Sequence, residues 1–180
     1  MSDPVTPEFS HRIPLEKLSS RAQDHVLDAD ASARKALAAR FDLIAVDRLV
    51  AYVSVEKQGK AALLAGRFEA AVTQRCALSG EPVPARVAET LALRFEPENP
   101  DPGEIELEAS ALDVLAVEDG AVDIGEAVAQ SLFLALDPYP RADEATLFRV
   151  RALILSEEEA EAAEAEAKAK ASPFAALKKP

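Results

Sequence analysis

The sequence is poor in several features that would point to particular protein classes. It has a single cysteine, so it cannot build an internal disulfide framework. Tryptophan is absent and aromatic residues make up only 5%, so we expect a modest core built mainly from Leu, Val and Ile. No apolar run approaches the ~20 residues that a membrane-spanning helix needs. The first residues lack the basic and apolar regions of a secretory signal, and we expect a cytoplasmic protein.

Basic residues are outnumbered as well. The chain of 180 residues has 20 Lys and Arg against 32 Asp and Glu, a net charge of −12. Affinity for nucleic acid depends on Lys and Arg that displace counterions from phosphates, so a chain this acidic repels naked nucleic acid. If the protein works near RNA, we expect it to do so through a basic protein partner, with no direct binding to duplex nucleic acid and no membrane contact.

Three long stretches alternate between apolar and polar residues with a period of two, which predicts β-strands over about 49–55, 61–75 and 85–95. Glu89 interrupts the apolar series of the third stretch, which indicates an edge or an opening there. Short turns between consecutive strands predict an antiparallel meander, which can curl toward a barrel or stay open with helices on one face. An exposed sheet edge would also permit dimerisation, which the sequence does not decide.

Two segments predict helices that pack on this sheet. Asp30 precedes 31–41, which is rich in helix-forming residues and carries apolar side chains on one face. Asp123 and Glu126 have the spacing of a capping box for a helix that runs to Leu136. Because capping explains both carboxylates, we assign them no catalytic role. We therefore expect an α+β fold with two packed helices and an exposed C-terminal helix or tail.

Weaker patterns predict the remaining elements. Short strands are expected at 7–13 and 23–27, a hairpin with an Asp-Gly turn at 114–122, and one more strand at 146–155. The segment 96–108 alternates prolines with carboxylates and is typical of a solvated acidic loop rather than a calcium site. With these elements, residues 1–155 are expected to form a single domain.

The turn between the second and third long strands contains the only cysteine. Cys76, Ser79, Gly80 and Pro82 follow the pattern of a metal-binding knuckle, except that Ser79 stands where a second cysteine would be. One thiol and one hydroxyl cannot hold a structural zinc ion. Period-two counting places Cys76 on the inner face of its strand, which favours a small buried side chain over a reactive thiol.

The last 25 residues have a different character. The stretch 156–171 is mostly alanine, with glutamate first and lysine later, which predicts a solvent-exposed helical spacer that cannot grip a core. Beyond it, Pro173, Phe174 and Leu177 lie near lysines and have the form of a short docking peptide. The alternative is a loose tail whose aromatic ring contacts its own domain. We expect 156–180 to be a spacer and flexible tail.

Three stretches together resemble the YceD family of bacterial and plastid proteins. They are the turn Cys76–Pro82, the segment Val117–Ile124 with the helix after it, and the ending Ser172–Leu177, which is similar to the family's Asn-Pro-Phe-x-x-Leu tail. Their order and spacing fit from Phe68 onward. The sequence departs from the family pattern at Ser79, where the family commonly has cysteine, and also at Gln130 and Asp137.

The resemblance implies a role in the accumulation of large-subunit ribosomal RNA, with no established enzymatic activity. We expect no enzymatic activity and no cofactor. The acidic net charge and the isolated pair Phe174 and Leu177 predict the partner, a basic ribosomal protein or assembly factor, or a pre-ribosomal particle. One alternative is an enzyme of RNA metabolism, for which the sequence offers no phosphate-binding loop and no nucleophile with a base. A second alternative is a redox or metal sensor centred on Cys76. No ligand cluster surrounds His11 or His25, which we expect to be ordinary polar strand residues.

Overall fold

A five-stranded sheet forms the centre of the structure. The computed structural model describes residues 7–97 and 113–153, and the chain divides into two compact units, 1–140 and 141–180. In the first unit the strand order is β2-β3-β4-β5-β6, with antiparallel neighbours except for the parallel pair β5 and β6. The strands are β2 (Gln23–Asp28), β3 (Ala45–Gln58), β4 (Ala61–Arg75), β5 (Pro82–Pro97) and β6 (Asp113–Val117).

The three long strands confirm the predicted antiparallel meander, and the sheet stays open rather than closing into a barrel. A separate two-stranded sheet pairs β1 (Arg12–Pro14) with β7 (Ala121–Asp123). The expected hairpin at 114–122 therefore keeps its Asp-Gly turn, but its two strands belong to different sheets. A single bridge, Glu118 with Ala121, joins them across the turn.

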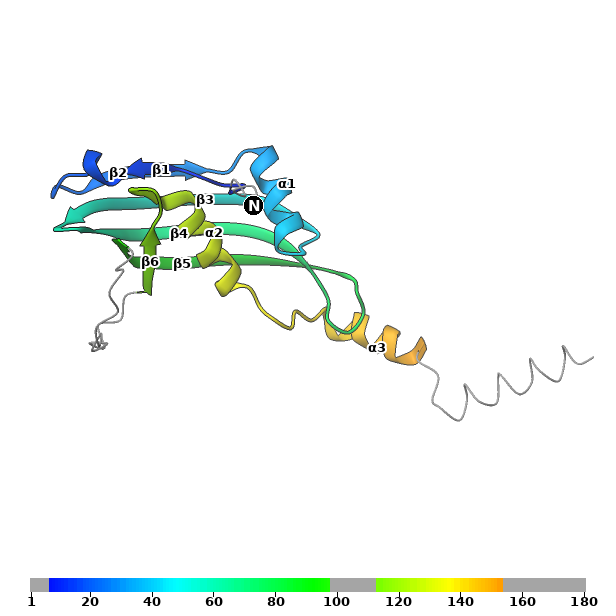
Figure 1. The fold of residues 1–180 in the computed structure, drawn as a ribbon. Helices are drawn as coiled ribbons and strands as arrows, with labels where there is room; N and C mark the ends of the chain where they lie inside the picture. The colour runs from blue at the N-terminus through cyan, green and yellow to red at the C-terminus, as the bar shows by residue number, and fades with distance from the viewer. Residues whose placement is uncertain (1–6, 98–112, 154–180) are drawn as a thin grey trace, which may run out of the picture. The chain divides into compact units, whose positions relative to one another are not determined.

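Two helices cover one face of the long strands (Figure 1). They are α1 (Ala31–Arg40) and α2 (Ile124–Ala135), and both contribute buried side chains to the same hydrophobic core. The predicted period-two pattern is confirmed, because the apolar series of all three long strands point to this core. Its largest fully buried side chains are Phe68, Leu37, Leu49, Leu64, Ile124 and Leu132.

One of the predicted elements is wrong, and another is shorter than expected. The segment expected as a strand at 146–155 is instead the helix α3 (Glu144–Leu153) of the second unit. Asp143 caps it by accepting the N–H of Thr146 at 2.8 Å, a local signal that outweighs the short apolar alternation. The first strand begins at Arg12 instead of residue 7.

Three of the expected segments lie largely or wholly outside the described residues. The acidic segment from 98 onward, the spacer and the tail lie outside the described residues. The domain boundary expected near 155 stays a prediction. None of the described helices is both long and apolar enough to cross a membrane.

Candidate functional site

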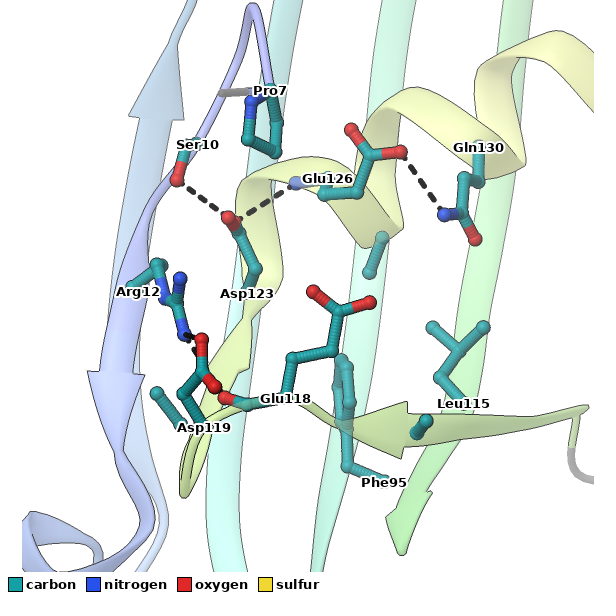
Figure 2. Close-up of a pocket in the computed structure, with 13 residues that line it drawn as sticks. Pro7, Ser10, Arg12, Phe95, Leu115, Glu118, Asp119, Asp123, Glu126 and Gln130 are labelled. Atoms are coloured by element: carbon teal, nitrogen blue, oxygen red, sulfur yellow. Dashed lines mark hydrogen bonds and ion pairs between the residues drawn. The ribbon is translucent and has the colours of Figure 1, made fainter. Parts of the chain in front are cut away.

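A groove of about 420 Å³ lies where β6, β7 and the start of α2 meet the N-terminal segment (Figure 2). Its floor is apolar and its rim carries four carboxylates. We call it the acidic groove. The floor residues are Phe95, Leu115, Ala121 and Ala127, and the polar rim residues are Ser10, Arg12, Glu118, Asp119, Asp123, Glu126 and Gln130.

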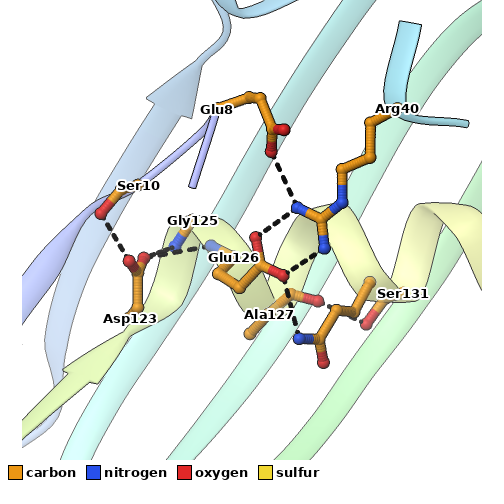
Figure 3. Close-up of polar contacts among 9 residues, drawn as sticks. Glu8, Ser10, Arg40, Asp123, Gly125, Glu126, Ala127 and Ser131 are labelled. Carbon is orange, nitrogen blue, oxygen red and sulfur yellow. Dashed lines mark hydrogen bonds and ion pairs between the residues drawn. The ribbon is translucent and has the colours of Figure 1, made fainter. Parts of the chain in front are cut away.

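Asp123 is the centre of the polar contacts at the start of α2 (Figure 3). Its Oδ1 accepts the N–H groups of Gly125 and Glu126, each at 3.1 Å, and so caps the helix as predicted. The same carboxylate accepts the N–H of His11 at 2.8 Å and the hydroxyl of Ser10. One side chain thus holds both the helix start and the N-terminal segment beside it.

Gly125 allows the N-terminal segment to cross the helix this closely. A Cβ atom at this position would lie 2.5 Å from the carbonyl oxygen of Phe9 and 2.8 Å from the backbone nitrogen of His11. Both neighbours are backbone atoms, which cannot rotate away as a flexible side chain would. A glycine is therefore required here for close approach.

Glu126 binds Arg40 of α1 through two hydrogen bonds of 2.7 and 2.8 Å. Arg40 also donates to Glu8 at 2.9 Å, and Gln130 donates to Glu126 at 3.0 Å. The guanidinium lowers the pKa of Glu126, although burial opposes this shift. The predicted capping box therefore forms only in part, because the Glu126 side chain turns to Arg40 instead of to the N–H of Asp123.

Glu118 and Asp119 are the carboxylates of the groove that are least engaged by the rest of the chain. Among the described residues Glu118 has no ion-pair partner, and its carboxylate projects over the groove in Figure 2. Asp119 contacts Arg12 at 3.4 Å, but its side chain is 90% exposed. Carboxylates accept hydrogen bonds and donate none, so a groove of this kind suits a Lys or Arg side chain whose aliphatic stem contacts the apolar floor.

Negative charge is concentrated in residues 98–140, which include the four carboxylates on the rim of the groove. Residues 98–140 contain eleven Asp and Glu and no Lys or Arg. Residues 1–97 contain thirteen acidic and thirteen basic residues, so they are neutral overall. The net charge of the whole chain is therefore unevenly distributed. Residues 1–97 are neutral overall, and 98–140 are strongly acidic.

The predicted turn at Cys76 is held by hydrogen bonds within the turn and by one to the segment after α2. Cys76 is buried, as expected, and its Sγ accepts the N–H of Ser79 at 3.4 Å. Gly80 has a φ of +72° and donates its N–H to the carbonyl of Cys76 at 2.9 Å, and Pro82 begins β5. The N–H of Ala77 reaches the carbonyl of Pro140, which ties the turn to the segment after α2. These contacts are typical of a turn that stabilises the fold, with Cys76 buried inside it.

The histidines form a pair on the N-terminal side of the sheet. His25 lies in β2 and His11 just before β1, with ring centroids 5.4 Å apart in an edge-to-face arrangement. Burial, and then the neighbouring His11, lower the pKa of His25. Across residues 7–97 and 113–153, no three His, Cys, Asp or Glu side chains gather as a metal site requires.

Sequence reasoning missed the partners of α2 because they lie far away along the chain. Arg40 is 86 positions from Glu126, and Ser10 is 113 positions from Asp123. No local periodicity could reveal such pairs. Pro173, Phe174 and Leu177 lie outside the described residues, and their role as a docking peptide stays a prediction.

Comparison with known proteins identifies the family. The family model described as "Large ribosomal RNA subunit accumulation protein YceD" matches residues 64–179, more than half of the chain. Neither the curated proteins nor the solved structures give a match. The matched region takes in the Cys76 turn, most of the acidic groove and the C-terminal segment. The chain therefore belongs to the YceD family, which is named for the accumulation of large-subunit ribosomal RNA.

Proposed function

We propose that this protein is a non-enzymatic, cytoplasmic factor in the accumulation of large-subunit ribosomal RNA, and that it acts by binding a basic protein. The observation that carries the proposal is the run of eleven acidic residues without a Lys or Arg between 98 and 140. Family membership indicates the process, which is the accumulation of large-subunit ribosomal RNA. The negative charge indicates a basic partner, which we propose is a ribosomal protein or an assembly factor. The same charge disfavours direct contact with RNA phosphates.

The acidic groove is the contact that we propose on the body of the protein. Glu118 and Asp119 are exposed, and the apolar floor beneath them suits the stem of a Lys or Arg side chain. Because these charges face solvent, the contact should weaken as salt rises and should owe more to fast association than to slow release. Phe174 and Leu177 of the tail are proposed as a second contact.

Binding measurements with two defined probes test this proposal. The full chain is mixed with RNA-free total protein of the large ribosomal subunit and, separately, with naked large-subunit ribosomal RNA, over a range of salt concentrations. We expect retention of one or a few basic ribosomal proteins at low salt, loss of this binding at high salt, and no binding of the RNA. Retention of naked RNA, or of no ribosomal protein at any salt concentration, would overturn the proposal.

A matched pair of variants locates the contact. Glu118→Gln with Asp119→Asn removes two charges from the acidic groove, and we expect it to weaken binding about fivefold at low salt. Glu16→Gln with Asp42→Asn removes the same charge elsewhere, and both aspartates have positive φ, 49° at Asp119 and 52° at Asp42. Equal weakening by both variants would show that only net charge matters. Deleting 172–180 tests the tail contact separately.

A further inference from the structure

The strand β5 has an outer edge that no other described strand covers along most of its length. One side of β5 pairs with β4, but on the other side β6 pairs only with Leu93–Pro97. Among the described residues, every second residue of 85–92 therefore presents an unpaired backbone N–H and C=O along this edge, which is the lower border of the long strands in Figure 1. Pro82 and Pro84 lack N–H groups and limit the usable edge to these eight residues.

A groove of about 460 Å³ runs beside the open edge, between β5 and the end of α2. Leu91 and Leu93 of the sheet form its apolar wall on one side, and Leu134 of α2, which is 77% exposed, lies on the other. Glu89 and Asp113 also line it. Among the described residues, neither carboxylate has an ion-pair partner. We call this site the edge groove.

We infer that the β5 edge takes an extended segment of a basic partner protein as an additional strand. Backbone hydrogen bonds along 85–92 would hold the segment, and its inward side chains would enter the edge groove. Side chains of a strand alternate between two faces, so those pointing inward meet Leu91 and Leu134 at some positions and Glu89 or Asp113 at others. The segment that fits best carries both apolar and Lys or Arg residues on its inward face. This inference rests on the proposed function for the charge of the partner.

The segment that leads into β6 cannot extend its parallel register over the whole edge. Continuing the parallel register of β6 backwards along β5 would place residue 105 beside Ala85, because Leu93 pairs with Asp113. Ala85 lies twelve residues along β5 from Pro97, roughly 40 Å away. The eight residues from Pro97 to residue 105 span at most about 28 Å. In this register the segment that leads into β6 therefore cannot reach the start of the edge at Ala85.

A second copy of the chain is a poor occupant for electrostatic reasons. It would bring its own Glu89 and Asp113 to an edge that already carries the same two carboxylates. Like charges placed side by side oppose association. A basic segment meets these carboxylates with opposite charge, and this complementarity selects the partner over self-association.

Peptide binding to the isotopically labelled full chain tests this inference. The probe is an eight-residue peptide with blocked ends in which a Val-Val-Lys-Lys order places both Val and Lys on each face, and the control probe replaces Lys by Glu. We expect amide signals of 85–92 to shift, and those amides that point away from β4 to exchange with solvent more slowly, in the presence of the Lys peptide only. Leu134→Ser and Glu89→Gln should each weaken binding about fivefold. Tyr139→Ser and Glu81→Gln are matched exposed controls that should leave it unchanged.

The results that would contradict this inference can be told apart from those that would contradict the proposed function. Shifts confined to the acidic groove, equal binding of the Glu peptide, or slow exchange in the free monomer of those amides in 85–92 that point away from β4 would each overturn the inference. A dimer in sedimentation experiments with protected β5 amides would assign the edge to a second copy instead. If the large-subunit ribosomal proteins bind while the β5 amides stay unchanged, the edge inference fails and the proposed function stands. If only the peptide binds, the proposed function fails instead.

Discussion

The two ends of helix α2 differ in how far their side chains are engaged by the rest of the protein. At the start, Asp123 and Glu126 find their partners within the chain, in the N-terminal segment and in α1 (Figure 3). At the end, Phe133 and Leu134 are 53% and 77% exposed, and Leu134 lines a groove beside an uncovered strand edge. The start of the helix is thus closed by internal contacts, whereas its end is left open.

This difference separates residues that serve folding from residues that are free to bind. Asp123 and Glu126 are the acidic residues with the clearest sequence pattern, yet their hydrogen-bonding capacity is largely used inside the protein. Among the described residues, no ion pair or side-chain hydrogen bond engages the carboxylates of Glu118 and Glu89, and Leu134 is mostly exposed. Substitutions at the start of α2 should therefore change stability, and those at its end should change binding.

The largest effect is expected from Gly125→Ala. The new methyl group would overlap the backbone of Phe9 and His11, and overpacking of this kind costs about 2 kcal/mol after the gain in helix propensity is subtracted. Thermal unfolding should show a melting temperature lower by about 4–8 °C. Gly120→Asn is the control, because its φ of +70° suits asparagine and no atom lies within 4 Å of the added Cβ. Equal stability of Gly125→Ala and the native protein would mean that the N-terminal segment does not cross α2 this closely.

A smaller effect is expected from breaking the contact between α1 and α2. Arg40→Met leaves the Glu126 carboxylate, whose side chain is 17% exposed, without its ion pair. The loss should be about 1–2 kcal/mol, moderated by the partial exposure of Arg40. Lys35→Met, on the same helix, is the control. A double-mutant cycle with Glu126→Gln should give a coupling energy of about 1 kcal/mol, and additive effects would rule out a direct contribution.

The pH dependence of this pair has a defined sign. Because Arg40 lowers the pKa of Glu126 in the folded state, the pair contributes fully above the usual pKa of 4.5. The contribution is lost as pH falls through the lowered pKa of the folded protein. Stability of the native chain should therefore fall more steeply on acidification than that of Arg40→Met. Parallel curves for the two proteins would contradict this assignment.

The smallest effect is expected at the open end of α2. Leu134→Ser should change the free energy of unfolding by less than about 0.5 kcal/mol, because the native side chain is mostly in solvent. Leu132→Ala, two residues earlier and fully buried, should cost about 2–5 kcal/mol. Chemical denaturation of both variants measures the contrast. A large loss in Leu134→Ser would show that the end of the helix is covered in solution, and the comparison would then fail.

Local patterns were sufficient for most of the elements. Period-two alternation predicted the three long strands and their buried faces, and Asp30 and Asp123 predicted the starts of two helices. Glu89 interrupts the apolar face of its strand, and no described strand pairs with the outer side of β5 at this position. The alternation in 146–155 failed because a single cap at Asp143 stabilised a helix there.

The sequence by itself determined the meander, the caps, the concentration of acidic residues and the family, because each of these depends on neighbours along the chain. Only the tertiary structure decided that Arg40 would occupy Glu126 and that Gly125 had to remain small. It also decided that the described part of β6 would pair in parallel with Leu93–Pro97 of β5. Such contacts join residues that are distant in sequence, and their geometry exists only once the sheet and helices have packed together.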